Sequence, residues 1–130
     1  MKKPLPVIAG IEASGIVVKA EGEAVQKWVG KRVSFIAIVT GSWANYAVTK
    51  PFLMFEIDED VSLQSASSGI VNPLTVIGLV EVFKSRKLKG IIHTAAASAL
   101  GRMMNKFCIK NGIPLLNVVR RKEQEELLKS

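Results

Sequence analysis

The amino-acid sequence predicts a mixed α/β protein, in which a β-rich first half is followed by a strand, helix and parallel strand. In the first half, three short runs are rich in Val, Ile and aromatic residues: Gly15–Lys19, Arg32–Val39 and Trp43–Val48. In the second half, apolar residues recur at helical spacing between two short apolar runs. Hydrophobic residues make up 48% and charged residues 22% of the 130 residues, which excludes the disordered class of protein.

The three runs of the first half are separated by Gly22, Gly30 and Gly41, which is typical of short antiparallel strands joined by turns. Further along, Ser62 can cap a short helix. Asn72 and Pro73 then predict the N-cap and first turn of a second helix that runs to about Lys84.

The second half contains the expected strands Ile91-Ile92 and Leu115–Val119, with one helix between them. This helix can begin at Ser98, and Asn111-Gly112 followed by Pro114 would end it. Its apolar residues recur at i, i+3, i+4, i+7 and i+8, and they are Leu100, Met103, Met104, Phe107 and Cys108. Two strands joined by a helix of this length are expected to be parallel, which makes a βαβ unit.

The turn between the first strand and the helix, Ala95 to Gly101 with Ala99 and Leu100 inside it, is a candidate phosphate-binding turn. Such turns favour glycine, because a missing Cβ lets the backbone approach a pyrophosphate at the helix N-terminus. In the spacing G-x-x-G-x-x-G this chain offers Ala95, Ser98 and Gly101. A positive φ at Ala95 or Ser98 would strain the backbone by about 1 kcal/mol or more. Gly101 has a second interpretation, in which it only allows the helix to pack closely.

Two arginines, Arg120 and Arg121, follow the second strand. A site that selects the unphosphorylated ribose usually has an acidic residue here, whereas arginines suit a 2′-phosphate. This arrangement favours NADP over NAD. In the alternative interpretation, Arg120 to Lys122 merely opens a solvated helix, Lys122–Lys129, in which Glu125 and Lys129 pair at i, i+4.

Four segments occur in the order expected of one known family. They match the patterns G-x-E-x-x-G-x-V, V-G-D-R-V, G-x-[YW]-A-E-Y and N-x-x-T, and they are Gly10–Val17, Trp28–Val33, Gly41–Tyr46 and Asn72–Thr75. Together with the βαβ unit, they make the chain resemble the medium-chain dehydrogenase/reductase superfamily, in its zinc-independent quinone and enoyl reductase branch.

The resemblance implies a partial GroES-like catalytic domain at residues 1–71, followed at 72–130 by the linking helix and a partial Rossmann NADP-binding domain, in a form shortened at both ends. It also implies NADPH as cofactor and hydride transfer to a quinone or an α,β-unsaturated carbonyl substrate. Asn72 and Thr75 would then border the nicotinamide and the substrate carbonyl. The NADPH would lie against Ala95, Ser98, Ala99, Leu100, Gly101, Arg120 and Arg121.

The sequence departs from the family's pattern at four positions. The family has glycine where Ala95 and Ser98 stand, and an acid where Lys31 and Asn45 stand. A second hypothesis therefore stays open, in which the chain is an inactive fragment of the family that serves as an oligomerising or partner-binding module. A two-stranded parallel sheet leaves strand edges unpaired, which favours pairing with a second copy or a partner chain.

Composition excludes other classes of function. A single His and a single Cys cannot provide a zinc site, so we expect His93 to be a hydrogen-bonded core imidazole and Cys108 a packed thiol. The formal net charge of +7 is spread along the chain, and the one cluster, Lys84–Lys89, lacks the interleaved aromatics that bind nucleic acid. No apolar run of signal or membrane length is present, so we expect a cytoplasmic protein.

Overall fold

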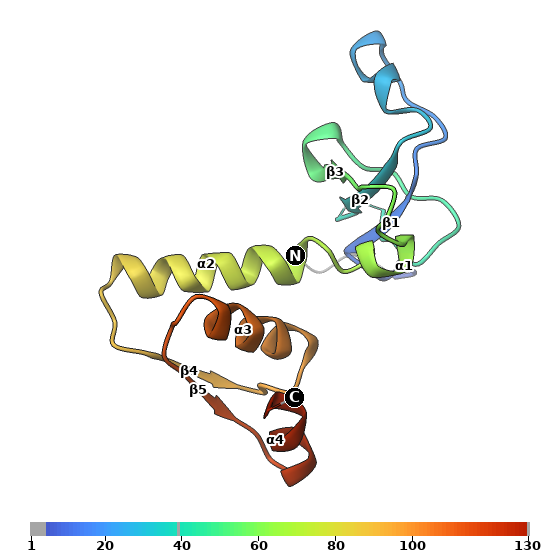
Figure 1. The fold of residues 1–130 in the computed structure, drawn as a ribbon. Coiled ribbons are helices and arrows are strands. Elements are labelled where there is room, and N and C mark those ends of the chain that lie inside the picture. The colour runs from blue at the N-terminus through green and yellow to red at the C-terminus, as the bar shows by residue number, and fades with distance from the viewer. Residues whose placement is uncertain (1–4, 39, 130) are drawn as a thin grey trace. The chain divides into compact units, whose positions relative to one another are not determined.

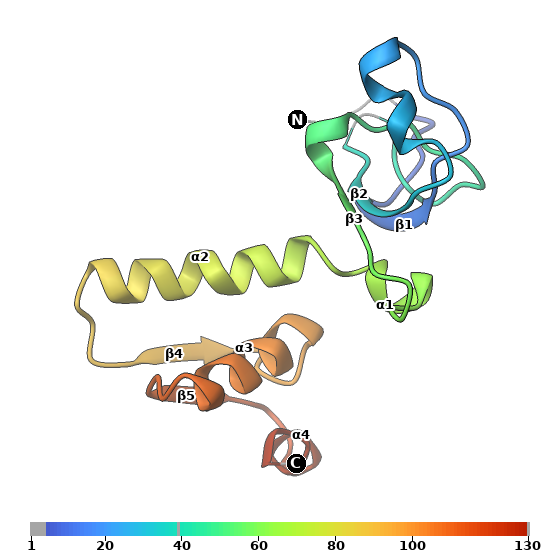
Figure 2. The same ribbon diagram turned by 45° about the horizontal axis from the view of Figure 1, so that its top comes forward.

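The computed structural model describes residues 5–38 and 40–129. The chain forms two compact units, Met1–Val71 and Asn72–Ser130. The first unit contains an antiparallel sheet and the second contains a parallel pair of strands with helices (Figures 1 and 2). The mixed α/β class predicted from the sequence is therefore confirmed.

The sheet of the first unit consists of β1 (Glu12–Ile16), β2 (Arg32–Ile36) and β3 (Met54–Glu56), in the order β1-β2-β3. Both pairs are antiparallel, with Ser14 opposite Ser34 and Ser34 opposite Phe55. The 3-10 helices η1 (Glu23–Trp28) and η2 (Pro51–Leu53) lie in the connections, and the short helix α1 (Leu63–Ala66) follows the sheet. Ser62 caps α1 as predicted, because its side chain accepts a hydrogen bond from the Ser65 amide.

Buried Ser34 fastens α1 to the sheet, because its hydroxyl donates to the Ala66 carbonyl at 2.7 Å. Arg32 lies at the start of β2. Its guanidinium donates to three carbonyls of the loop that follows β3, those of Asp58, Glu59 and Val61. These long-range bonds join parts of the first unit that lie far apart in the sequence.

The strand prediction for the first half was partly wrong. The first strand begins at Glu12 rather than Gly15, and the second ends at Ile36, while Val39 lies outside the described residues. Residues 43–48 form bends and coil, with Trp43 and Tyr46 almost fully exposed, and the third strand is Met54–Glu56 instead. A β-like composition fits any half-buried pleated surface, and strand pairing decides which run becomes a strand.

The linking helix α2 (Val71–Ser85) begins one residue before Asn72, so the prediction that Asn72 is its N-cap was wrong. Pro73 lies in the first turn, as predicted. The carboxylate of Glu12 accepts hydrogen bonds from the Ile70 and Val71 amides, at 3.3 and 2.9 Å. A side chain remote in sequence thus satisfies the amides at which the helix begins.

The second unit contains α2, β4 (Ile91–Thr94), α3 (Ala99–Lys110), β5 (Leu115–Val118) and α4 (Lys122–Lys129). The strands β4 and β5 are parallel, so the predicted βαβ unit is confirmed. The core of this unit lies between the helices α2 and α3 and consists of Val76, Val80, Met104 and Cys108. Side chains of the inner face of the sheet, Ile91 and Leu115, pack against it.

Both predicted ends of α3 are confirmed. The Ser98 hydroxyl accepts a hydrogen bond from the Gly101 amide at 3.1 Å, which is an N-cap. Asn111 is the C-cap residue, and Gly112 follows with φ +63°, a conformation that glycine adopts without strain. Among residues 5–38 and 40–129, no helix combines the length and the apolar character that crossing a membrane requires.

Candidate functional site

The turn that joins β4 to α3 brings the five predicted phosphate-binding positions together. Thr94 and Val118 are register partners at the ends of the two strands, and the Ala96 amide reaches the Val118 carbonyl at 3.4 Å. The amides of Ala99 and Leu100 begin α3, where helix geometry leaves them without a carbonyl of the same helix to bond. Such amides and the positive end of the helix dipole suit an anion.

Two positions in this turn show why glycine is favoured. Ala95 has φ +52°, a left-handed conformation that costs a non-glycine residue about 1 kcal/mol or more. Gly101 is buried, and a Cβ there would overlap the backbone of Ala96. Close packing therefore requires glycine at position 101, and a phosphate contact there stays a prediction. Ser98 has an ordinary extended backbone and serves as the cap.

Arg120 and Arg121 lie in the short connection between β5 and α4, and both are exposed. Neither guanidinium forms an ion pair with another residue of the described ranges. The Arg120 amide donates to the side chain of Gln124 at 3.1 Å, which fixes the backbone at the start of α4. The alternative interpretation, in which these basic residues open a solvated helix, also predicted α4 and its Lys129–Glu125 ion pair correctly. The hydrogen bond and the charge of Lys129 lower the pKa of the Glu125 carboxyl.

The predicted catalytic pair, Asn72 and Thr75, lies in the first turn of α2. Asn72 is half-buried and Thr75 is exposed. In both views of the ribbon, this first turn lies at the same end of the second unit as the start of α3 (Figures 1 and 2). The pair and the candidate phosphate-binding turn therefore share one side of that unit.

Sequence reasoning missed a hydrogen-bonded pair of amides, buried Asn105 and half-buried Asn117. The Asn117 side chain donates to Asn105 at 2.7 Å, and the Asn105 side chain donates to the Leu128 carbonyl at 2.9 Å. His93 is the register partner of Asn117. Its buried Nδ1 has no hydrogen-bond partner among the described residues, so the prediction of a hydrogen-bonded imidazole fails at this atom. A polar residue such as Asn105 on an otherwise apolar helix face is the signal that could have revealed the amide pair.

Cys108 is fully buried, and burial raises the pKa of its thiol. A raised pKa keeps the thiol protonated near neutral pH, whereas a nucleophilic cysteine needs the thiolate. The structure therefore agrees with the predicted packed thiol.

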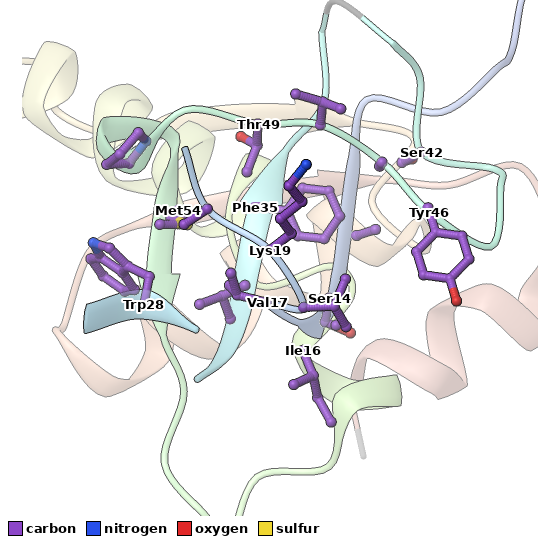
Figure 3. A pocket seen from close by; sticks show the side chains of 18 of the residues that line it. Ser14, Ile16, Val17, Lys19, Trp28, Phe35, Ser42, Tyr46, Thr49 and Met54 are labelled. Atoms are coloured by element: carbon purple, nitrogen blue, oxygen red, sulfur yellow. The ribbon is translucent and has the colours of Figure 1, made fainter. Parts of the chain in front are cut away.

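The first unit contains an open, mostly apolar cavity of about 770 Å³. Figure 3 shows Phe35 of β2 in its middle, with Trp28 and Tyr46 on opposite sides. Three of its hydroxyls are engaged in hydrogen bonds, because Ser14, Ser42 and Thr49 donate to the carbonyls of Leu63, Glu12 and Ile36. The other polar groups that line the cavity include the side chains of Lys19, Glu21, Asn45 and Tyr46.

No protein-family model matches the chain. Among curated proteins, it is 30% identical over 131 residues to the mitochondrial enoyl-[acyl-carrier-protein] reductase of Caenorhabditis elegans. The alignment covers 100% of this chain and 38% of that protein. Over 122 residues it is also 33% identical to a highly reducing polyketide synthase of Cladosporium cladosporioides, of which it covers 5%.

Solved structures agree with these relatives. A candidate NADPH:quinone reductase from Mesorhizobium loti superposes with a TM-score of 0.84 at 35% identity, covering 92% of this chain and 36% of that one. The Escherichia coli quinone oxidoreductase complexed with NADPH gives a TM-score of 0.84 at 21% identity, covering 99% and 40%, a similarity that shows the fold alone. The chain therefore spans about two fifths of the length of these quinone and enoyl reductases.

Proposed function

We propose that this chain, which belongs to the medium-chain dehydrogenase/reductase superfamily and to its quinone and enoyl reductase branch, binds NADPH through its second unit and takes part in the reduction of quinones or α,β-unsaturated carbonyls. In this proposal residues 1–71 are part of the GroES-like catalytic domain, and residues 72–130 hold the linking helix and the first part of the NADP-binding domain. Its relatives among curated proteins and solved structures support this assignment.

The observation that carries the proposal is the arrangement of the β4–α3 turn beside Arg120 and Arg121. The amides at the N-terminus of α3 suit a pyrophosphate, and two guanidiniums without an ion pair in the described part of the chain follow the neighbouring parallel strand. Cations at the N-terminus of a helix are electrostatically unfavourable by about 0.3–1 kcal/mol, and these arginines directly precede α4. A role for them in α4 stability is therefore disfavoured, whereas a 2′-phosphate would compensate both charges.

NADPH, when bound, supplies the hydride, and the residues of the chain bind and orient it. The hydroxyl of Thr75 and the side-chain amide of Asn72 are the groups that would border the reacting ring. Both are hydrogen-bond donors at the start of a helix, where a developing negative charge on a substrate oxygen is stabilised. Two substitutions, Asn72→Ala and Thr75→Ala, would test these roles once a substrate is found.

The experiment is a titration of the folded chain with NADPH and with NADH, followed by cofactor fluorescence. Arg120→Ala/Arg121→Ala is expected to abolish the preference for NADPH. The matched control is Lys106→Ala/Lys110→Ala, which removes the same charge from exposed positions of α3 and is expected to preserve the preference. If the wild-type chain showed no saturable binding up to roughly millimolar NADPH, equivalent to about 4 kcal/mol, the proposal would be wrong.

A second candidate function is oligomerisation through the outer face of the β4–β5 sheet. Parallel sheets are normally covered on both faces, yet Ile92, Leu116 and Val118 are exposed on the face away from α3, at 71%, 60% and 43%. A second copy of the chain could bury these apolar side chains. The candidate shares oligomerisation with the alternative hypothesis drawn from the sequence, but through the face of the sheet rather than through its strand edges.

Light scattering during size-exclusion chromatography tests this second candidate. If copies pair through this face, Leu116→Lys is expected to convert a dimer into a monomer. Ile109→Lys is the matched control, since Ile109 on α3 is also apolar and, at 71%, even more exposed than Leu116, but lies outside this sheet face. A monomeric wild-type chain at high concentration would rule the candidate out.

A further inference from the structure

The second unit contains a buried side-chain amide, that of Asn105, which is hydrogen-bonded to the half-buried amide of Asn117. Asn105 on α3 is 9% exposed, and its neighbours Met104 and Cys108 are core residues. Its oxygen accepts a hydrogen bond from the Asn117 side chain on β5, at 2.7 Å. Its nitrogen donates to the main-chain carbonyl of Leu128 on α4, at 2.9 Å. One continuous series of hydrogen bonds therefore joins β5, α3 and α4.

This series holds an element that apolar packing holds weakly. None of the residues of α4 is buried, so burial of its side chains contributes little to its position. Leu128 is in the last turn of α4, where main-chain carbonyls have no partner within the helix. The bond from Asn105 satisfies one of these carbonyls and fixes the far end of α4 against α3.

The connection between β5 and α4 contains Arg120 and Arg121. Asn117 holds its beginning, because it lies in β5 and bonds to Asn105. The Asn105–Leu128 bond holds α4, which follows it, and the side chain of Gln124 holds the Arg120 amide itself. The backbone that carries the two guanidiniums is thereby restrained on both sides.

Both polar atoms of the Asn105 side chain are hydrogen-bonded, whereas the buried Oδ1 of Asn117 has no partner among the described residues. Buried polar atoms are costly unless satisfied, and a leucine at position 105 would suit the apolar face of α3 without that cost. Buried polar groups whose hydrogen bonds are made fix the relative positions of the elements that they join, whereas apolar contacts alone allow several packing arrangements. We propose that Asn105 and Asn117 are positioning residues for the 2′-phosphate of NADPH, acting through α4 on Arg120 and Arg121. This inference rests on the proposed function.

The test compares the dissociation constants of NADPH and NADH in three variants. Asn105→Leu is expected to raise the dissociation constant of NADPH about tenfold, because it displaces the arginines that form charge-assisted bonds with the 2′-phosphate. The dissociation constant of NADH should change less than about twofold. The variant Asn105→Leu/Asn117→Leu replaces both amides by apolar groups, which keeps the unit folded and still releases the Leu128 carbonyl. It is expected to show the same selective loss, with faster amide hydrogen exchange in α4. Asn111→Ala, which removes the exposed side-chain amide of the α3 C-cap residue, is the control and should leave the ratio of the two dissociation constants unchanged.

If these residues only stabilised the fold, replacing them would weaken the binding of NADPH and of NADH alike. The ratio of the two dissociation constants therefore decides between the two roles. If the wild-type chain prefers NADPH and the double variant keeps that preference, the positioning role is wrong and the proposed function stands. If the wild-type chain shows no preference for NADPH, the proposed function fails and the positioning role fails with it.

Discussion

The two units of the chain differ in how completely their apolar side chains are buried. In the second unit, Val76, Val80, Met104 and Cys108 are almost fully buried in one cluster. In the first unit, Phe35 borders an open cavity of about 770 Å³, while Trp43, Tyr46 and Phe52 are more than 70% exposed. Both units also expose apolar residues, such as Ile92 and Leu116 in the second, so the difference lies in the core: the second unit has a closed cluster of large side chains, whereas Phe35 of the first unit borders an open cavity.

This difference separates elements defined by local sequence from elements defined by distant contacts. The helix α3 carries its own cap, apolar face and stop within residues 98–112. The first unit depends instead on bonds such as Ser34 to Ala66 and Glu12 to Val71, which connect residues 32 and 59 positions apart. The closed unit should therefore respond most strongly to changes in its core, and the open one to loss of single long-range bonds.

The largest expected effect compares core truncation in the two units. Met104→Ala removes a fully buried side chain and should lower the free energy of unfolding of the second unit by about 3 kcal/mol. Phe35→Ala removes a half-buried ring that faces an open cavity, and it should cost about 1 kcal/mol. Hydrogen exchange followed by mass spectrometry reports each unit separately. Equal losses for the two variants would contradict the distinction between a closed and an open core.

The same distinction explains how much of the structure the sequence predicted. The βαβ unit was predictable because Ser98, the apolar stripe of α3 and Asn111-Gly112 act on neighbouring residues. The third strand was not, because residues 43–48 contain more β-favouring residues than Met54–Glu56, and only pairing with β2 selects the latter. For the candidate site, the turn and both arginines were found, whereas the Asn105–Asn117 pair depends on a contact between α3 and β5.

The cap of α2 illustrates that limit and gives the second prediction. Sequence adjacency pointed to Asn72, yet Glu12 from β1 accepts the bonds of the Ile70 and Val71 amides. Glu12→Ala should therefore lower stability by about 1 kcal/mol, as other losses of a helix cap do. Glu12→Gln keeps a side-chain oxygen and should lose less than half of that. Hydrogen exchange of the first turn of α2 would measure both, and an unchanged rate in Glu12→Ala would refute the capping role.

A third, smaller effect concerns the strained turn of the closed unit. Ala95→Gly should raise stability by up to about 1 kcal/mol, because φ +52° strains alanine but not glycine. Ala97→Gly, two residues later, is the control and should lower stability slightly, since glycine there only adds freedom to the unfolded chain. Urea denaturation midpoints measure both changes. A loss of stability in Ala95→Gly would mean that the turn does not adopt this conformation in solution.

The smallest expected effect at neutral pH concerns the Cys108 thiol, which reports whether the core of the second unit is closed. Burial raises the pKa of this thiol above its value in the unfolded chain, which is about 8.5. Its contribution to stability is therefore fully present below that pH and is lost as the pH rises toward the folded-state pKa. The free energy of unfolding should fall as the pH rises above about 8.5, and less so in Cys108→Ala, which has no thiol.

The reactivity of the same thiol provides an independent check. Native chain should react with iodoacetamide far more slowly than chain unfolded in urea, because alkylation requires an accessible thiolate. Met104→Ala, which opens the core beside Cys108, should accelerate the native reaction, while Phe35→Ala in the other unit should leave it unchanged. Rapid alkylation of the native wild-type chain would show that the second unit opens as readily as the first, and the contrast between the two units would then disappear.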